Sequence, residues 1–199
     1  MNSPELNSAL AKTIADLEVI AERLDGTGGL DEMVDEAVNK LTNAWAAEQS
    51  WFAQCDEDEW SLSPMGEGWY NPANEDDSGA YFEWAYFEGV EKDHYLVTSL
   101  CQKGHDKVGI IFTQEIVNRN QWKKIITELS DFVADTGFVL AERSLNFFLP
   151  IKIDPEVLAA GIAEDDFDAG LRQYRDVLDQ LLRAKPAFDK IIARLQEIA

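Results

Sequence analysis

The side chains that most often act as nucleophiles, bases or metal ligands are scarce in this chain. It has two cysteines, Cys55 and Cys101, and two histidines, His94 and His105. No Gly-x-Ser-x-Gly sequence is present, and neither cysteine lies in a known catalytic motif. Cys101 and His94 could pair across a hairpin, but no other residue pattern supports catalysis by them. We therefore expect a protein that is not an enzyme.

The spacing of the possible metal ligands does not indicate a metal site either. Cys101-x3-His105 could supply two zinc ligands near one turn, with His94 and Cys55 as further ligands. Cys55 precedes His94 by 39 residues, which is not a diagnostic zinc spacing. The acidic run 56–59 has no glycine turn of the kind found in calcium-binding loops. We expect weak, nonspecific binding of divalent ions, and neither a dedicated metal nor a cofactor.

A carboxylate cluster beside a lysine is typical of metal-dependent nucleases, and Glu83, Glu88, Glu91 and Lys92 superficially fit that pattern. A nuclease must also hold phosphates, which requires Lys, Arg or helix N-termini approached by glycine-rich loops. Lys92 is the one basic residue between positions 51 and 100, and no P-loop or dinucleotide motif occurs. Direct binding of nucleic acid is therefore disfavoured.

The net charge of −21 is unevenly distributed over the 199 residues. Residues 1–100 contain 22 acids and 4 bases, whereas residues 101–150 are neutral and residues 151–199 carry −3. Aromatic side chains interrupt the densest acidic stretch, 56–93, so we expect a folded, strongly negative surface that attracts basic partners. The alternative, acidity for solubility alone, does not explain the asymmetry. The candidate partner-binding residues are Asp56, Glu57, Asp58, Glu59, Trp60, Glu67, Trp69, Glu75, Asp76, Asp77, Glu83, Glu88, Glu91 and Asp93.

Residues 1–53 predict an N-terminal helical hairpin. Ser3-Pro4-Glu5 is typical of a helix start, and apolar residues then recur at alternating spacings of four and three. The glycine-rich run 26–29 predicts a turn before a second helix, from about Asp31 to Trp51. The two stripes are Leu10, Ile14, Leu17, Ala21 and Leu24, then Val34, Val38, Leu41 and Trp45. Each stripe either packs on the rest of the fold or forms a seam for self-association, which would give a homodimer.

Residues 54–199 predict an α+β domain, unless the whole chain forms one continuous domain. Breaker residues over 54–80 indicate a long acidic loop, followed by three strands of an antiparallel meander. We expect those strands at 80–88, 94–101 and 107–115, with a turn at 103–106. A middle helix starts after Asn118 or Asn120 and ends at Gly137. Two further strands (138–143, 146–153), a break at 154–155 and a long C-terminal helix from about Glu164, kinked or interrupted at Pro186, complete the order.

The amino-acid composition is that of an ordinary globular protein. Hydrophobic residues make up 46% of the chain, enough for a large core. We find no apolar signal segment and no run of about 18 apolar residues, and we read both cysteines as free thiols. The expected compartment is the cytoplasm.

Together these patterns predict an acidic binding protein that inhibits or neutralises a basic protein. Fixed carboxylates could occupy a groove built for phosphates, as in a DNA mimic, an anti-defence protein or an immunity protein. The expected partner is a nuclease, a toxin or another nucleic-acid-binding protein, with neither nucleic acid nor membrane bound directly. The alternative is a structural or chaperone-like protein that binds through its apolar helical seams.

Overall fold

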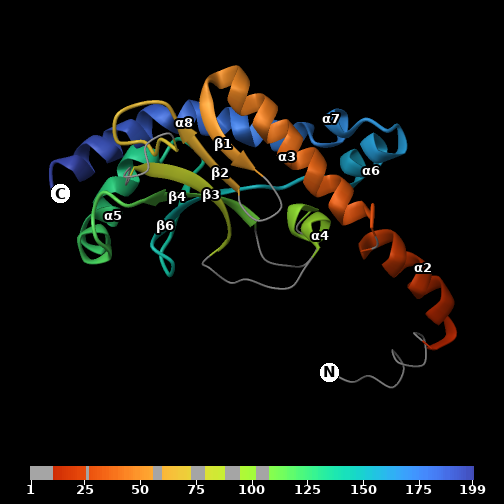
Figure 1. Cartoon of the computed structure of the whole chain (residues 1–199). Coiled ribbons are helices and arrows are strands. Elements are labelled where there is room, and N and C mark those ends of the chain that lie inside the picture. Colours follow the sequence, from red (N-terminus) through yellow and green to blue (C-terminus); the bar gives the residue numbers. More distant parts are fainter. Residues whose placement is uncertain (1–10, 26, 56–59, 73–78, 88–94, 102–107) are drawn as a thin grey trace.

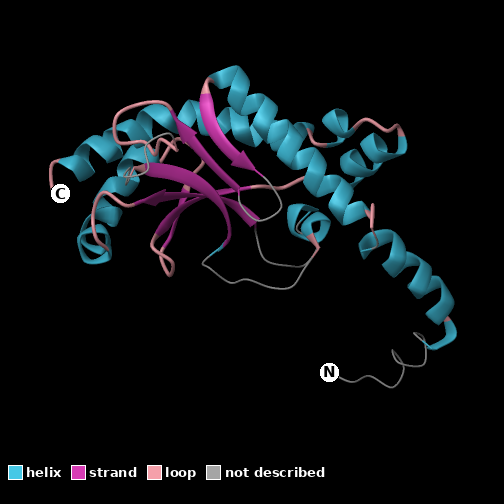
Figure 2. Ribbon diagram, in the orientation of Figure 1, coloured by secondary structure: helices cyan, strands magenta, loops and turns pink. Residues whose placement is uncertain are grey.

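One antiparallel sheet, with helices packed on one of its faces, organises the structure (Figures 1 and 2). The computed structural model describes residues 11–25, 27–55, 60–72, 79–87, 95–101 and 108–199. The helices are α2 (Ile14–Asp25), α3 (Leu30–Gln49), α4 (Leu96–Cys101), α5 (Arg119–Val133), α6 (Pro155–Ala163), α7 (Phe167–Gly170) and α8 (Arg172–Gln196). The strands are β1 (Trp51–Cys55), β2 (Trp60–Pro64), β3 (Ala80–Tyr86), β4 (Val108–Gln114), β5 (Val139–Ala141) and β6 (Asn146–Pro150). The α+β class is therefore confirmed.

The sheet order is β1-β2-β3-β4-β6-β5, with every neighbouring pair of strands antiparallel. Strand alternation places Phe82 and Trp84 of β3 on the face that the helices cover, with Phe112 opposite Phe82 on β4. Glu83 lies on the other face, opposite Ile111. The sequence predicts a three-strand meander extended by two further strands; the structure instead has a four-strand meander, β1 to β4, extended by β6 and β5.

The core between sheet and helices is aromatic and centred on Phe188 of α8. Its ring lies 4.7 Å from that of Phe138, 4.8 Å from Phe112 and 5.1 Å from Phe82, measured between centroids. The predicted stripe of α3 belongs to the same core, which confirms that this stripe packs on the rest of the fold. The described side chains of α2 do not belong to that core, and α2 projects beyond the end of α3 (Figure 1).

Several local signals in the sequence are confirmed by the helix ends. Asn118 caps α5: its side chain accepts from the backbone N–H of Asn120 and Gln121, and the Gln121 side chain bonds back to the Asn118 N–H. Asp154 caps α6 with Pro155 in the first turn, so the predicted break is a helix start. None of the described helices is long and apolar enough to span a bilayer.

The prediction of a strand at 94–101 is wrong, because residues 96–101 form helix α4. Val97 and Thr98 are β-branched and favoured a strand by propensity. Tertiary contacts decide otherwise: the Asp31 carboxylate accepts a hydrogen bond from the Val97 N–H, and Leu100 is fully buried against the core. The predicted turn at 103–106 lies outside the described residues.

The predicted continuous loop at 54–80 is also wrong, because β2 lies within it and β1 precedes it. Helix α3 ends at Gln49, and Ser50 adopts a left-handed conformation (φ 57°) that turns the chain into β1. Pro64 is tolerated because it is the last residue of β2. The C-terminal helix runs through Pro186 without interruption, since core contacts hold it on both sides of the proline.

Replacing Phe188 by alanine tests this account of the core. We expect Phe188→Ala to lower the free energy of unfolding by about 3–5 kcal/mol, because it leaves a cavity among packed rings. Urea denaturation followed by tryptophan fluorescence measures the change. Phe132→Ala makes the same substitution at a side chain that is 43% exposed and should change the free energy much less. Equal losses in both variants would contradict a core centred on Phe188.

Candidate functional site

Ten of the fourteen predicted partner-binding residues lie outside the described residues. These are Asp56, Glu57, Asp58, Glu59, Glu75, Asp76, Asp77, Glu88, Glu91 and Asp93. The structure does define the residues that flank them. Residues 56–59 join Cys55 to Trp60, which face each other at the end of the β1–β2 pair. Residues 88–94 follow β3 and precede α4.

The described flanking residues show which acidic connections start from the same end of the sheet. Ser61 pairs with Glu83, so the start of β2 and the end of β3 lie at one end. The connections 56–59 and 88–94 both leave the sheet there. The connection 73–78 instead ends just before β3 begins, at the opposite end. The predicted acidic residues therefore belong to connections at two ends of the sheet.

A pocket of about 540 Å³ lies near the first of these ends, and we call it the acidic pocket. It is lined by Leu24, Thr27, Asp31, Glu32, Asp35, Trp84 and Leu96. The lining comes from the last turn of α2, the α2–α3 turn, the first turns of α3, strand β3 and the start of α4. It combines three carboxylates with one indole, and no lysine or arginine is among its described lining residues. This pocket can accept a cationic group beside an aromatic ring.

Two of the three carboxylates also hold the surrounding backbone in place. Asp31 accepts from the Val97 N–H at 3.1 Å and so fixes α4 to α3. Glu32 accepts from the Gly28 N–H in the α2–α3 turn, and Asp35 accepts from the Asn39 side-chain amide at 3.1 Å. Acids near a helix N-terminus are favoured by the helix dipole.

The sequence analysis did not predict these three residues as a site, because the pattern of their helix is dominated by its apolar stripe. One signal could have pointed to them. Asp31 and Asp35 are one helical turn apart, where two like charges disfavour an isolated helix. Such a pair is best explained by tertiary contacts of the carboxylates, and the Asp31–Val97 bond is one of these.

Trp84 connects the acidic pocket to a buried polar cluster. Its ring packs against Trp60 (5.6 Å between centroids) and edge-on against Tyr174 of α8 (5.9 Å). The Tyr174 hydroxyl lies 2.7 Å from the Thr42 hydroxyl, which in turn donates to the Val38 carbonyl. Since the Thr42 proton is used in that bond, Tyr174 donates its own proton to Thr42. The lone pairs of the Tyr174 oxygen remain open to other donors.

Two indole N–H groups lie beside this oxygen. The Nε1 atoms of Trp60 and Trp84 each expose less than 1 Å² and form no well-directed hydrogen bond with a described residue. Burial raises the pKa of Tyr174 well above its usual range, because the charged phenolate is disfavoured in the core; the indole N–H groups of Trp84 and Trp60, which would stabilise a phenolate, oppose that rise more weakly. The fully buried Tyr174 therefore stays neutral, and its ring packs edge-on against Trp84.

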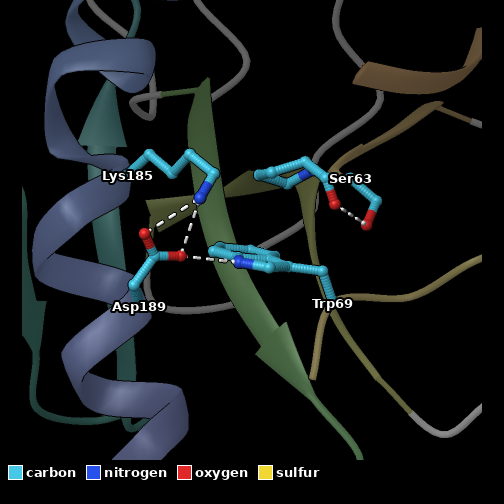
Figure 3. A network of polar contacts seen from close by, with 5 residues as sticks. Ser63, Trp69, Lys185 and Asp189 are labelled. Atoms are coloured by element: carbon cyan, nitrogen blue, oxygen red, sulfur yellow. Dashed lines mark hydrogen bonds and ion pairs between the residues drawn. The ribbon is translucent and has the colours of Figure 1, made fainter. Parts of the chain in front are cut away.

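Trp69, another predicted partner-binding residue, is a core residue at the other end of the sheet. It is 3% exposed, and its Nε1 donates to an Asp189 carboxylate oxygen at 2.8 Å (Figure 3). Lys185 pairs with the same carboxylate at 2.9 Å and lies 5.9 Å from the centre of the indole ring. Nearby, the Ser63 hydroxyl donates to the Tyr70 carbonyl. Trp69 thus anchors the segment after β2 to α8 and presents no surface to a partner.

Of the three remaining described candidates, only Trp60 contacts a residue that lines the acidic pocket. Glu83 accepts a hydrogen bond from the Thr113 hydroxyl on the face of the sheet opposite Trp84. Glu67 is exposed in the turn region after β2. Trp60 is half-buried and is the one predicted residue that the described structure places next to Trp84.

The residues considered for catalysis or metal binding are dispersed as far as they are described. Cys55 and Cys101 are both buried and belong to no disulfide, and His94 and His105 lie outside the described residues. Within the described part of the chain, no three His, Cys, Asp or Glu side chains come close enough to hold a metal ion.

Replacing Tyr174 by phenylalanine tests the polar cluster. Tyr174→Phe removes the partner of Thr42 and the neighbour of both indoles, so we expect a loss of about 1–3 kcal/mol in the free energy of unfolding. The pH dependence gives a second readout. The pKa is raised in the folded state, so Tyr174 should lower stability as pH rises above about 10, its usual pKa. Urea unfolding between pH 7 and 11 should show a smaller alkaline loss in the variant; equal losses would contradict the cluster.

No known protein was found to be similar to this chain. Protein-family models, curated proteins and solved structures were searched, and none of them matches the chain. The function proposed below is accordingly argued from the residues and geometry of this chain.

Proposed function

We propose that this protein is a non-enzymatic, acidic binding protein that inhibits or neutralises a basic, nucleic-acid-binding protein. One observation carries the proposal. The acidic pocket is lined by three carboxylates and one tryptophan, near the end of the sheet from which the acidic connections 56–59 and 88–94 leave. Carboxylates held on a helix and an indole held on a strand suit a lysine or arginine of a partner.

The physical argument is competition for a phosphate-binding groove. Proteins that bind DNA gain much of their affinity by pairing Lys and Arg with phosphates. A protein with a net charge of −21 is attracted to such a groove, and this attraction raises the rate at which the two proteins associate. A nuclease or a toxin whose substrate is nucleic acid would be blocked. A DNA-mimic-like anti-defence protein or an immunity protein is the specific form that we propose, acting in the cytoplasm.

A second candidate function has its own observation. Four of the eight large hydrophobic side chains exposed in the described structure are Ile14, Val19, Ile20 and Met33, within α2 and the start of α3. Exposed apolar residues that gather in one region mark a protein contact. A structural or chaperone-like protein that binds through this region is the alternative, with the acidity serving solubility.

Capture from a bacterial lysate at low and high salt tests the proposed function. The test variant carries Gln or Asn at Glu32, Asp35 and residues 56–59, six charges in all. We expect the wild-type protein to retain a basic nucleic-acid-binding protein at low salt and release it at high salt, because charge attraction is screened. The variant should lose that partner, and added duplex DNA should displace it from the wild type.

A matched variant controls for net charge. It neutralises six exposed acids elsewhere: Asp131, Asp135, Glu142, Glu164, Asp165 and Asp168. If this control loses the partner as completely as the test variant, total charge rather than the acidic pocket is responsible. A partner that both variants retain at high salt would contradict the proposal and support the alternative function.

A further inference from the structure

The exposed apolar residues of α2 form a stripe that leads into the acidic pocket. Ile14 and Ile20 are 56% and 59% exposed. Leu17 and Leu24 are half-buried, and the four residues recur about every turn on one side of the helix. Leu24, the last of them, lines the acidic pocket together with Asp31 and Asp35. Apolar side chains and carboxylates therefore meet at one continuous surface.

The position of α2 leaves this stripe accessible. The helix projects beyond α3, away from the sheet and from α5 (Figure 1). A 12-residue helix is about 18 Å long, so the stripe runs along about three turns. A helix of similar length in another protein would match it, because helix-in-groove recognition uses apolar anchors at successive turns.

The charge around the stripe selects among possible occupants. Residues 14–36 contain eight acids against one base, Arg23. A second copy of this chain would bring the same acids against one another, and like charges at an interface oppose association. A membrane surface with anionic lipids would be repelled for the same reason. A helix with an apolar stripe and lysine or arginine on its flanks is complementary to both features.

We propose that α2 is the docking site for a basic, amphipathic helix of the partner protein, with one of its cationic side chains in the acidic pocket. The inference rests on the proposed function and names how the basic partner is recognised. The partner helix covers Ile14, Leu17 and Ile20, and its lysine or arginine lies between Asp35 and the Trp84 ring. Apolar burial then supplies affinity, and the carboxylates supply register and rapid association.

Synthetic peptides of about 18 residues provide a defined probe. One carries leucines in a single helical stripe with lysines on the flanks; a second has the same composition in scrambled order; a third has glutamate in place of lysine. Fluorescence anisotropy with the full-length protein measures their affinities at low and high salt. We expect the striped basic peptide to bind at least about 10-fold more tightly than the scrambled one, since only it aligns apolar anchors.

Two double variants locate the binding surface. Ile14→Ala with Ile20→Ala shortens exposed side chains in a helix, and we expect the affinity for the striped peptide to fall at least about 10-fold. Glu32→Gln with Asp35→Asn should weaken binding mainly at low salt. Phe132→Ala removes an exposed apolar side chain from α5, and it should leave the affinity unchanged. Far-UV circular dichroism checks that every variant keeps its helices.

Three outcomes would overturn the inference. The first is that striped and scrambled peptides bind equally, because charge alone would then explain binding. The second is no binding of the striped peptide, or no effect of the Ile14 and Ile20 substitutions. The third is a dimer in analytical ultracentrifugation that Ile14→Ala with Ile20→Ala dissociates, which would make a second copy the occupant. The lysate experiment stands apart: a partner captured there despite failure of the peptides would leave the proposed function intact and remove only the role of α2.

Discussion

Helix α8 is the element on which the other parts of the structure depend, because its contacts hold both the core and the pocket residues in place. Phe188 fills the centre of the aromatic core beneath the sheet. Polar groups of the same helix meet the tryptophans of other elements: Asp179 accepts from Trp45, Asp189 accepts from Trp69, and Tyr174 lies against Trp84. A tryptophan buries much area but carries a polar N–H, and α8 supplies the acceptors that allow Trp45 and Trp69 to be buried.

This arrangement also explains how a chain with such excess negative charge keeps a defined surface. Repulsion among carboxylates opposes the compact state, most strongly at low salt. In the acidic pocket the carboxylates accept hydrogen bonds from backbone N–H groups and a side-chain amide, so they are held by neutral donors. Neutral donors leave the negative charge of the Asp31 and Glu32 carboxylates in place. A cationic group in the pocket would reduce the repulsion between these carboxylates. This reduction would strengthen the binding of the cationic group.

Sequence reasoning succeeded where local patterns and burial agree. The strand at β3, the strand at β4, the start of α5 at Asn118 and the apolar stripe of α3 all follow from alternation, helical periodicity or capping chemistry. It failed at α4 because Val97 and Thr98 have strand propensity, while the contacts that make the segment helical come from Asp31, 66 residues earlier in the chain. It failed at β2 because Ser63-Pro64 resembles a loop, while pairing with β1 makes it a strand.

The candidate site divides in the same way. The sequence by itself determined the class of fold, the strong acidity of the first half and the presence of two apolar helical stripes, because these depend on composition and on short periodicities. The tertiary structure alone decided which acids face a common pocket, that Trp69 is buried while Trp84 lines that pocket, and that the stripe of α3 is covered while that of α2 is exposed. Those outcomes depend on contacts between residues that are far apart in the chain. A local sequence pattern does not predict which distant residues come into contact.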